Sequence, residues 1–279
     1  MTNSIVARYD ENFELMLKFA SSAGFGEVMV GFGESKVFES DTYEKEVEKM
    51  GELLNKYSLR ASQTHLPCYH LLDSSEIVDE KTEMSIRRGI WASGKLGSDW
   101  TAFHPRSAVN KGCSRGVSFE DNRRMLEIYL EDAEKAGVGI AVENMPLYPH
   151  SHNEWRFFGG GWEELCELCE VLKSPRFGIC WDFGHAHTAG IDQKVALREV
   201  GSLLKMTHVH DNYKNGDQHQ LPGLADRQWN SIGWVSVMQT LKSIGYEGTL
   251  ALETIMPPIC MCENFFKLAF DSLEYLKSL

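Results

Sequence analysis

One interval along the chain constrains the fold more than any other sequence feature. Short apolar runs end on polar side chains at positions 39 residues apart, namely His65, His104, Glu143 and Asp182. The run before Glu143, residues 140–142, is apolar throughout, which is typical of a parallel strand buried on both faces. A carboxylate at the end of such a strand needs a partner or a metal ion, because burying an unpaired charge is costly.

Strand-like and helix-like segments alternate around these positions along the whole chain. The expected strands are residues 4–8, 27–31, 59–65, 99–104, 138–143, 177–182, 204–208 and 248–253. The expected helices are residues 13–20, 42–57, 79–96, 118–136, 162–172, 192–203, 231–244 and 264–279. Strict alternation predicts parallel strands with helical crossovers, and eight such units close into a barrel. We therefore predict an α/β fold, a (β/α)8 TIM barrel with a single domain over residues 1–279.

Local signals predict how several of these segments begin and how they are joined. Ser118 is expected to cap the helix that ends at Ala136, and Gly137 to stop it. His185 and His187 are expected in a loop after the sixth strand. A long aromatic loop, residues 144–161, is expected either to close over a ligand or to cover the barrel top or a dimer contact.

Six polar residues are expected to converge, because the C-terminal ends of barrel strands share one face. They end strands three to eight and are His65, His104, Glu143, Asp182, His208 and Glu253. Three carboxylates at close range could not all stay ionised without a cation, since their repulsion would raise their pKa values. Histidine and carboxylate ligands together suit Zn, Mn, Co or Fe(II). Any one of the six alone is more often structural, so the prediction of a metal site rests on the set.

The motifs that contain these residues resemble those of the sugar phosphate isomerase/epimerase superfamily, the xylose isomerase-like TIM barrels, which also include endonuclease IV-type nucleases. The motifs are V-E-N with Glu143, D-x-x-H with Asp182 and His185, H-x-x-D with His208 and Asp211, D-x-H with Asp217 and His219, and A-L-E with Glu253. The resemblance covers nearly the whole chain and is clearest from the third strand onward. It is specific for the superfamily and not for the reaction.

Similarity to the ketose 3-epimerases implies one divalent metal ion, Zn, Mn or Co, on Glu143, Asp182, His208 and Glu253. It further implies that the two glutamates act as acid and base and that His185 holds a substrate oxygen. The metal would acidify a C–H bond beside a carbonyl and stabilise an enediolate. On this basis we expect an isomerase or epimerase of a small sugar or related hydroxy-carbonyl compound.

Similarity to the nucleases implies an alternative function, zinc-dependent cleavage of DNA at abasic sites. Nine residues would then hold three zinc ions, namely His65, His104, Glu143, Asp182, His185, His208, Asp217, His219 and Glu253. The formal net charge of −12, from 40 acidic and 28 basic residues, argues against a nucleic-acid partner. A third alternative is a sugar-binding barrel without catalysis, which would have no need of the Glu143–Glu253 pair.

The remaining predictions concern the substrate and the setting of the protein. Candidate substrate-binding residues are His65, His104, Arg106, Trp155 and Arg227. The expected partner is a small-molecule sugar, and the sequence permits a homo-oligomer. We see no signal peptide and no run of 18 apolar residues, so we expect a cytoplasmic protein without a membrane partner.

Overall fold

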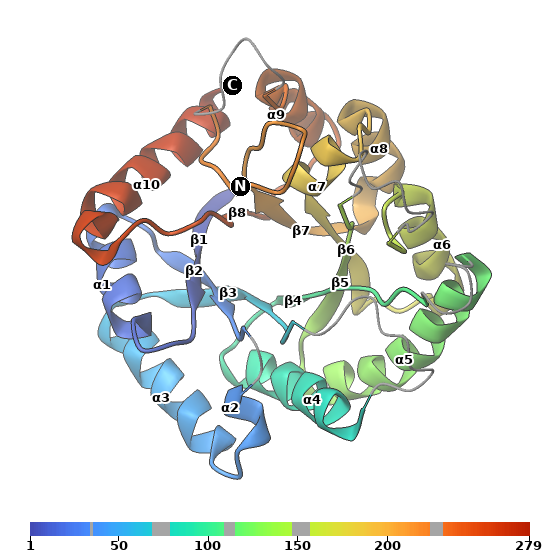
Figure 1. Ribbon diagram of the computed structural model, residues 1–279, viewed down its shortest axis with the longest axis horizontal. Helices are drawn as coiled ribbons and strands as arrows, with labels where there is room; N and C mark the ends of the chain where they lie inside the picture. The colour runs from blue at the N-terminus through green and yellow to red at the C-terminus, as the bar shows by residue number, and fades with distance from the viewer. Residues whose placement is uncertain (34–35, 69–78, 109–114, 147–156, 224–230) are drawn as a thin grey trace.

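The chain forms a closed barrel of eight parallel strands surrounded by helices (Figure 1). The computed structural model describes residues 1–33, 36–68, 79–108, 115–146, 157–223 and 231–279. Strands that follow one another in the sequence are neighbours in the barrel, and β8 pairs with β1 to close it. The predicted (β/α)8 TIM barrel is therefore confirmed.

The eight strands have the following bounds: β1 Thr2–Arg8, β2 Glu27–Gly31, β3 Arg60–His65, β4 Trp100–Phe103, β5 Gly139–Glu143, β6 Phe177–Asp182, β7 Leu204–Val209 and β8 Thr249–Leu252. The helices are α1 Phe13–Ala23, α2 Lys36–Glu39, α3 Tyr43–Lys56, α4 Glu80–Lys95, α5 Arg115–Ala136, α6 Trp162–Leu172, α7 Phe183–Thr188, α8 Gln193–Val200, α9 Trp234–Ser243 and α10 Cys262–Ser278. Two 3-10 turns, Gly201–Leu203 and Ile259–Met261, precede β7 and α10.

A layer of small and flexible side chains fills the barrel interior just below the strand ends. It consists of Met29, Ala102, Ala141, Cys180, Met206 and Ala251, all fully buried. Side chains on a strand alternate between its two faces, so the residue two positions further on points inward as well. The polar residues in those positions are His104, Glu143, Asp182, His208 and Glu253. The strand pleat therefore stacks the candidate site directly on this layer.

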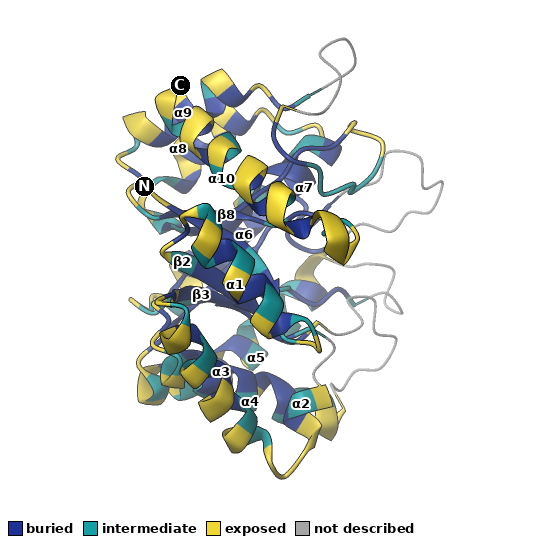
Figure 2. Ribbon diagram, turned by 90° about the vertical axis from the view of Figure 1, so that its left-hand side faces the viewer, coloured by how far each residue is buried: buried dark blue, intermediate teal, exposed yellow. Residues whose placement is uncertain are grey.

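A larger apolar core lies between the outer face of the barrel and the helices. Trp181, on the outer face of β6, is fully buried there, and its indole N–H donates to Gln193 Oε1 on α8 at 3.2 Å. Fully burying one large apolar side chain contributes about 1.5–3 kcal/mol, so this layer stabilises the barrel that carries the site. Figure 2 shows the buried strands inside a shell of helices whose outer faces are exposed. None of the helices described is long and apolar enough to cross a membrane.

Three local predictions are wrong. Ser118 does not cap a helix, because α5 already begins at Arg115; the Ser118 hydroxyl instead accepts the N–H of Ala108 at 3.1 Å. His185 and His187 lie in the short helix α7 rather than in a loop. Ser231 does not start a helix, since α9 begins at Trp234; its hydroxyl donates to Asp211 at 2.9 Å. Tertiary hydrogen bonds override the local pattern at Ser118 and Ser231, and the Asp182 side chain caps α7 by accepting the N–H of His185 at 2.6 Å.

Candidate functional site

Glu143 lies at the centre of the polar face of the barrel and is 1% exposed. Its Oε2 is 3.2 Å from His104 Nε2 and 3.2 Å from His208 Nδ1. The same oxygen is 3.4 Å from His65 Nε2, and Oε1 is 3.2 Å from His185 Nδ1. One carboxylate therefore faces imidazoles from four different segments of the chain.

The first cluster around Glu143 is a set of four groups whose ligand atoms lie within 4.8 Å of one another, namely Glu143, Asp182, His208 and Glu253. His208 Nδ1 is 3.0 Å from Glu253 Oε2 and 3.9 Å from Asp182 Oδ2. Two glutamates, one aspartate and one histidine around a common point form a donor set that suits a divalent ion of the Zn or Mn type.

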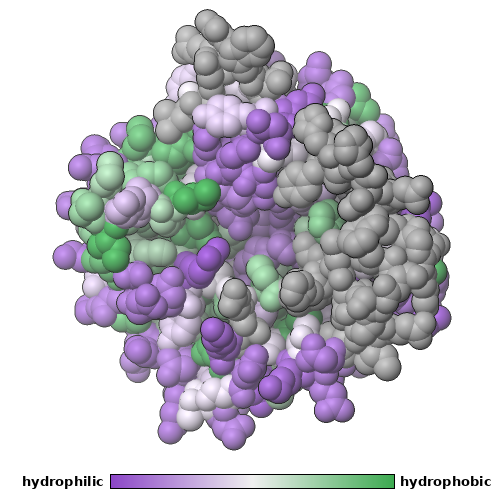
Figure 3. Space-filling model, viewed as in Figure 1, coloured by the Kyte–Doolittle hydropathy of each residue, from purple (hydrophilic) through white to green (hydrophobic). Residues whose placement is uncertain are grey.

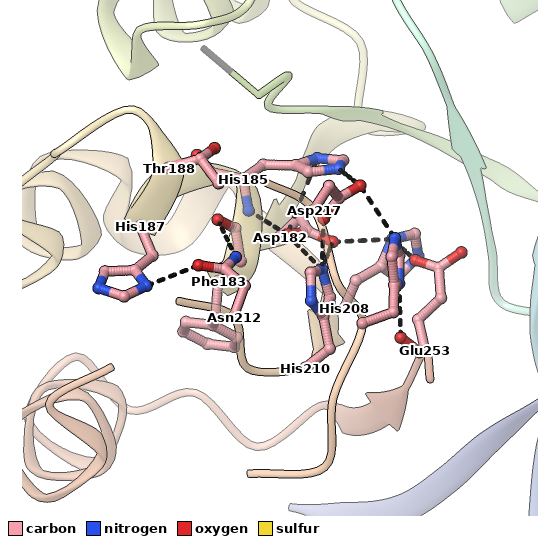
Figure 4. A network of polar contacts seen from close by, with 12 residues as sticks. Asp182, Phe183, His185, His187, Thr188, His208, His210, Asn212, Asp217 and Glu253 are labelled. Atoms are coloured by element: carbon pink, nitrogen blue, oxygen red, sulfur yellow. Dashed lines mark hydrogen bonds and ion pairs between the residues drawn. The ribbon is translucent and has the colours of Figure 1, made fainter. Parts of the chain in front are cut away.

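A second cluster lies beside the first and consists of His185, His210, Asp217 and His219, again with ligand atoms within 4.8 Å of one another. Figure 4 labels His185, His210 and Asp217 of this cluster. Asp217 Oδ2 is 3.2 Å from His185 Nε2 and 3.0 Å from His219 Nε2. A further pair, His65 and His104, lies on the other side of Glu143 with its two Nε2 atoms 3.1 Å apart. All nine residues of the multinuclear alternative are thus near one another.

Backbone carbonyl groups fix the orientation of three of the histidines. His65 Nδ1 lies 2.8 Å from Leu66 O, His185 Nδ1 lies 2.8 Å from Asn144 O, and His219 Nδ1 lies 2.7 Å from Glu253 O. A carbonyl oxygen can only accept, so Nδ1 carries the proton in each ring and Nε2 faces the clusters. Metal-binding histidines are held in this way by their second nitrogen.

The electrostatics of the site favour a bound cation. Burial alone would raise the pKa of Glu143, but His208 and His104 outweigh it and hold that pKa well below the ordinary value. Burial would lower the pKa of His219, but Asp217 and Glu253 raise it to about 9. Glu143 is therefore ionised and His219 takes up a proton, which a metal ion would displace.

Several buried polar atoms of the clusters form no hydrogen bond of good geometry within the described ranges, although oppositely charged groups lie 3.0 to 3.6 Å from some of them. These buried atoms are Glu143 Oε2, both nitrogens of His208, His210 Nδ1 and Asp217 Oδ1. Unsatisfied buried polar groups cost about 1–3 kcal/mol each, so such a concentration requires an explanation. Metal coordination is one, and the chemistry of the donors fits it.

Sequence reasoning did not assign a role to His210, which is fully buried and is the member of the second cluster that contacts the first. Its Nε2 is 3.0 Å from each carboxylate oxygen of Asp182 and 3.6 Å from Asp217 Oδ1. Its ring stacks on that of His219, with centroids 4.0 Å apart. The signal was present in the sequence, because His208 and His210 are two residues apart and so share one face of an extended segment.

Asn144 and Asp211 support the site without belonging to either cluster. The Asn144 side chain both donates to Asp182 O and accepts from Asp182 N, at 2.9 and 2.7 Å. The buried Asp211 carboxylate accepts hydrogen bonds from the backbone N–H groups of Asn212, Gly223 and Ile232, the Ser231 hydroxyl and the Trp234 indole. Asp211 therefore ties the segment after β7 to the start of α9.

The other predicted residues occupy different positions. Arg106 is buried, and Asn122 on α5 bonds both its backbone N–H and its carbonyl oxygen. His187 points away from the clusters and its Nδ1 lies 2.8 Å from Asn212 Oδ1 (Figure 4). Trp155, Arg227 and residues 147–156 of the aromatic loop lie outside the described residues.

Comparison with known proteins gives one family model, described as the xylose isomerase-like TIM barrel, that matches residues 17–279. A protein of Methanocaldococcus jannaschii, named uncharacterized protein MJ1311, is 30% identical over 215 residues, which cover 75% of this chain and 69% of that protein. A probable endonuclease 4 of Staphylococcus saprophyticus is 24% identical over 219 residues, covering 72% of this chain and 70% of that protein.

Solved structures with the same fold include proteins with epimerase titles and one with an AP endonuclease title. A D-tagatose 3-epimerase-like protein superposes with a TM-score of 0.72 at 20% identity, over 100% of this chain and 99% of that chain. A D-psicose 3-epimerase gives 0.73 at 13% identity, over 99% and 98%. An AP endonuclease, family 2, from Brucella melitensis gives 0.67 at 15% identity, over 91% and 93%. By its match over residues 17–279, this chain belongs to the xylose isomerase-like TIM barrel family.

Proposed function

We propose that this protein is a divalent-metal-dependent isomerase or epimerase of a small sugar or related hydroxy-carbonyl compound. The observation that carries the proposal is the cluster of Glu143, Asp182, His208 and Glu253, in which two glutamates flank one histidine. Solved structures with a fold similar to that of this protein include the D-tagatose 3-epimerase-like protein and the D-psicose 3-epimerase.

The four residues of this cluster would hold the metal. When bound, the cation would polarise a substrate carbonyl and the adjacent hydroxyl and stabilise the negative charge that develops between them. Among the described residues, Glu143 Oε2 and the His208 nitrogens lie buried among charged groups without a well-formed hydrogen bond, which supports this assignment. Asn144 and His210 would keep Asp182 in place as a ligand.

Glu143 and Glu253 would move the proton. Each carboxylate has two oxygens, so one can face the metal while the other accepts a proton from the substrate carbon. Burial raises the pKa values of both glutamates, but the surrounding imidazoles lower them by more. Both glutamates are therefore ionised before the substrate binds. Glu143 ends β5 and Glu253 directly follows β8, three strands further round the barrel, so the two could act on two sides of one substrate carbon.

His185 would hold a substrate oxygen. Its Nδ1 lies 3.2 Å from Glu143 Oε1 and 2.8 Å from the carbonyl of Asn144. The ring is thus fixed next to the proposed base and cannot turn away without losing the carbonyl contact. His65 and His104 border the opposite side of Glu143 and are the candidates for further substrate hydroxyl groups.

The test is proton exchange in heavy water. Protein loaded with Mn, Co or Zn would be incubated with a panel of ketoses and hydroxy-ketones, and exchange at the carbon beside the carbonyl would be followed by NMR. We expect metal-dependent exchange and the appearance of an epimer or isomer. Absence of exchange with every compound and every metal would contradict the proposal.

A second candidate function is hydrolysis of DNA phosphodiesters at abasic sites. The observation in its favour is the contiguity of three groups of ligands: the His65–His104 pair, the cluster with Glu143 and the cluster with Asp217. This function predicts three tightly bound zinc ions and nicking of abasic DNA. Against it stands the net charge of −12, which disfavours contact with phosphates.

A further inference from the structure

A cavity of about 420 Å³ opens beside the two clusters, between α1 and the segment that joins β8 to α10. Two cluster residues, His219 and Glu253, form part of its wall. The remaining wall is largely apolar and includes Leu15, Met16, Phe19, Met256, Pro257 and Ile259. The volume lies within the range of about 300–1,000 Å³ that small-molecule sites occupy.

Outside the two cluster residues, the polar side chains of this wall are those of Arg8, Asp10, Asn12 and Thr254, so most of the wall offers no hydrogen-bond partner to a sugar hydroxyl. Each sugar hydroxyl that leaves water needs a hydrogen-bond partner, and an unpaired one costs about 1–3 kcal/mol. Arg8 and Asp10 bring one charge of each sign to the cavity, so its wall gains no net charge from them. Figure 3 shows hydrophobic surface to the left of the hydrophilic centre of the barrel face, over α1 and the start of α10.

We propose that the substrate carries an alkyl or aryl group, which this cavity binds while the hydroxy-carbonyl end lies on the cluster with Glu253. The inference rests on the proposed function and narrows its substrate class from sugars in general to hydroxy-carbonyl compounds with an apolar portion. Because Glu253 belongs both to the first cluster and to the cavity wall, one molecule can contact both.

A second copy of the chain is the competing occupant of this surface. Ile255, Ile259 and Met261 are 67%, 52% and 57% exposed, and an exposed apolar patch often marks an association surface. The continuity of the cavity with His219 and Glu253 favours the substrate, since a dimer contact would not need to reach the clusters. The experiment below separates the two.

The probes are straight-chain hydroxamic acids, from acetohydroxamate to octanoylhydroxamate, which chelate a metal through two oxygens and differ only in their alkyl tail. Affinity for the zinc-loaded protein would be measured by titration calorimetry. We expect binding to tighten about fourfold for each methylene that enters the cavity. The gain should stop when the tail fills it.

Two variants each replace one apolar side chain of the cavity wall by a polar side chain of similar shape. Leu15→Asn and Met256→Gln should flatten the dependence on chain length and leave acetohydroxamate affinity unchanged, because its methyl group is too short to enter. Ile128→Gln is the matched control, since Ile128 is 46% exposed on α5, away from the cavity. It should behave as the wild type, and sedimentation would report the oligomeric state of every variant.

Three results would overturn the inference. If acetohydroxamate binds but longer tails bring no gain, the cavity is not a substrate subsite and the proposed function is unaffected. If no hydroxamate binds, the proposed function falls together with the inference. If Met256→Gln dissociates an oligomer and leaves the chain-length series unchanged, the surface belongs to a second copy of the chain.

Discussion

Gly184 lies so close to the imidazole of His210 that a Cβ on residue 184 would be 1.9 Å from Cε1 of the ring. That distance is far below any contact between non-bonded carbon atoms. His210 in turn contacts both oxygens of Asp182 and stacks on His219. Glycine at position 184 therefore leaves the space in which the buried His210 of the second cluster reaches Asp182 of the first.

Gly184→Ala should displace His210 and destabilise the protein by about 1–3 kcal/mol, the usual cost of overpacking a close-packed interior. Urea unfolding would measure it. The matched control is Gly26→Ala, because a Cβ there meets nothing within 4 Å. The control should change stability by less than about 0.5 kcal/mol, and equal effects of the two substitutions would refute the contact.

The barrel could be predicted because its signals are periodic and repeated. Strand runs such as the one before Glu143 and the regular alternation with helices leave few topologies for a parallel sheet. The starts of single elements depended on tertiary contacts instead. Ser118 has the side chain of a helix cap but bonds to Ala108, a residue outside its helix. No local pattern carries that information.

Only the part of the candidate site that lies at the strand ends could be predicted, because the C-terminal ends of barrel strands share one face. His65, Glu143 and Asp182 were assigned from their spacing, and the structure brings them together. His210 follows from the same alternation along β7 but was not assigned. The cavity beside Glu253 could not be foreseen, because it depends on how residues 254–262 pass over α1.

The Asp211 carboxylate provides a second test, because five donors converge on it. Asp211→Asn replaces one acceptor oxygen by an NH2 group that would face other donors. We expect a loss of about 3 kcal/mol in unfolding free energy, since hydrogen bonds to buried charged groups are the strong ones.

The control for Asp211 is Asp192→Asn. Asp192 caps α8 by accepting from Lys194 and Val195 at the surface, and asparagine caps a helix about as well. Chemical unfolding should therefore show a clearly lower unfolding free energy for Asp211→Asn than for Asp192→Asn. Comparable stability of the two would mean that Asp211 does not hold the segment after β7.

The metal-free protein should lose stability as the pH rises from about 7 to about 10. The pKa of His219 is raised from 6.5 to about 9, so its charged form stabilises the fold fully below 6.5, and this contribution is lost as the pH passes about 9. The lowered pKa of Glu253 affects stability at acidic pH instead. The ionised Glu253 stabilises the fold fully above pH 4.5, and this stabilisation is lost as the pH falls further.

A bound metal ion should prevent this loss of stability at alkaline pH, since the ion would take the place of the proton between Asp217 and His219. Scanning calorimetry of the metal-free and zinc-loaded protein would show it. The melting temperature should fall with pH only in the metal-free sample. Parallel curves for the two samples would contradict metal binding at this cluster.

His219→Gln tests how many ions the site holds. The substitution removes a ligand of the second cluster and leaves Glu143, Asp182 and His208 untouched. Metal analysis after dialysis should show one ion fewer than in the wild type if both clusters are occupied, with the remaining ion retained. An unchanged count would mean that only the first cluster binds a metal.

The central claim is that Glu143 and Glu253 move the substrate proton, and the most direct measurement is solvent deuterium exchange by Glu143→Gln and Glu253→Gln at saturating metal. Each variant loses a group that can accept the proton, so exchange should fall by a factor of at least about 1,000 in both, within the usual contribution of general acid–base catalysis. Metal content and unfolding midpoint, measured on the same samples, would show that fold and cation are retained. Exchange at the wild-type rate in either variant, with metal bound, would contradict the account.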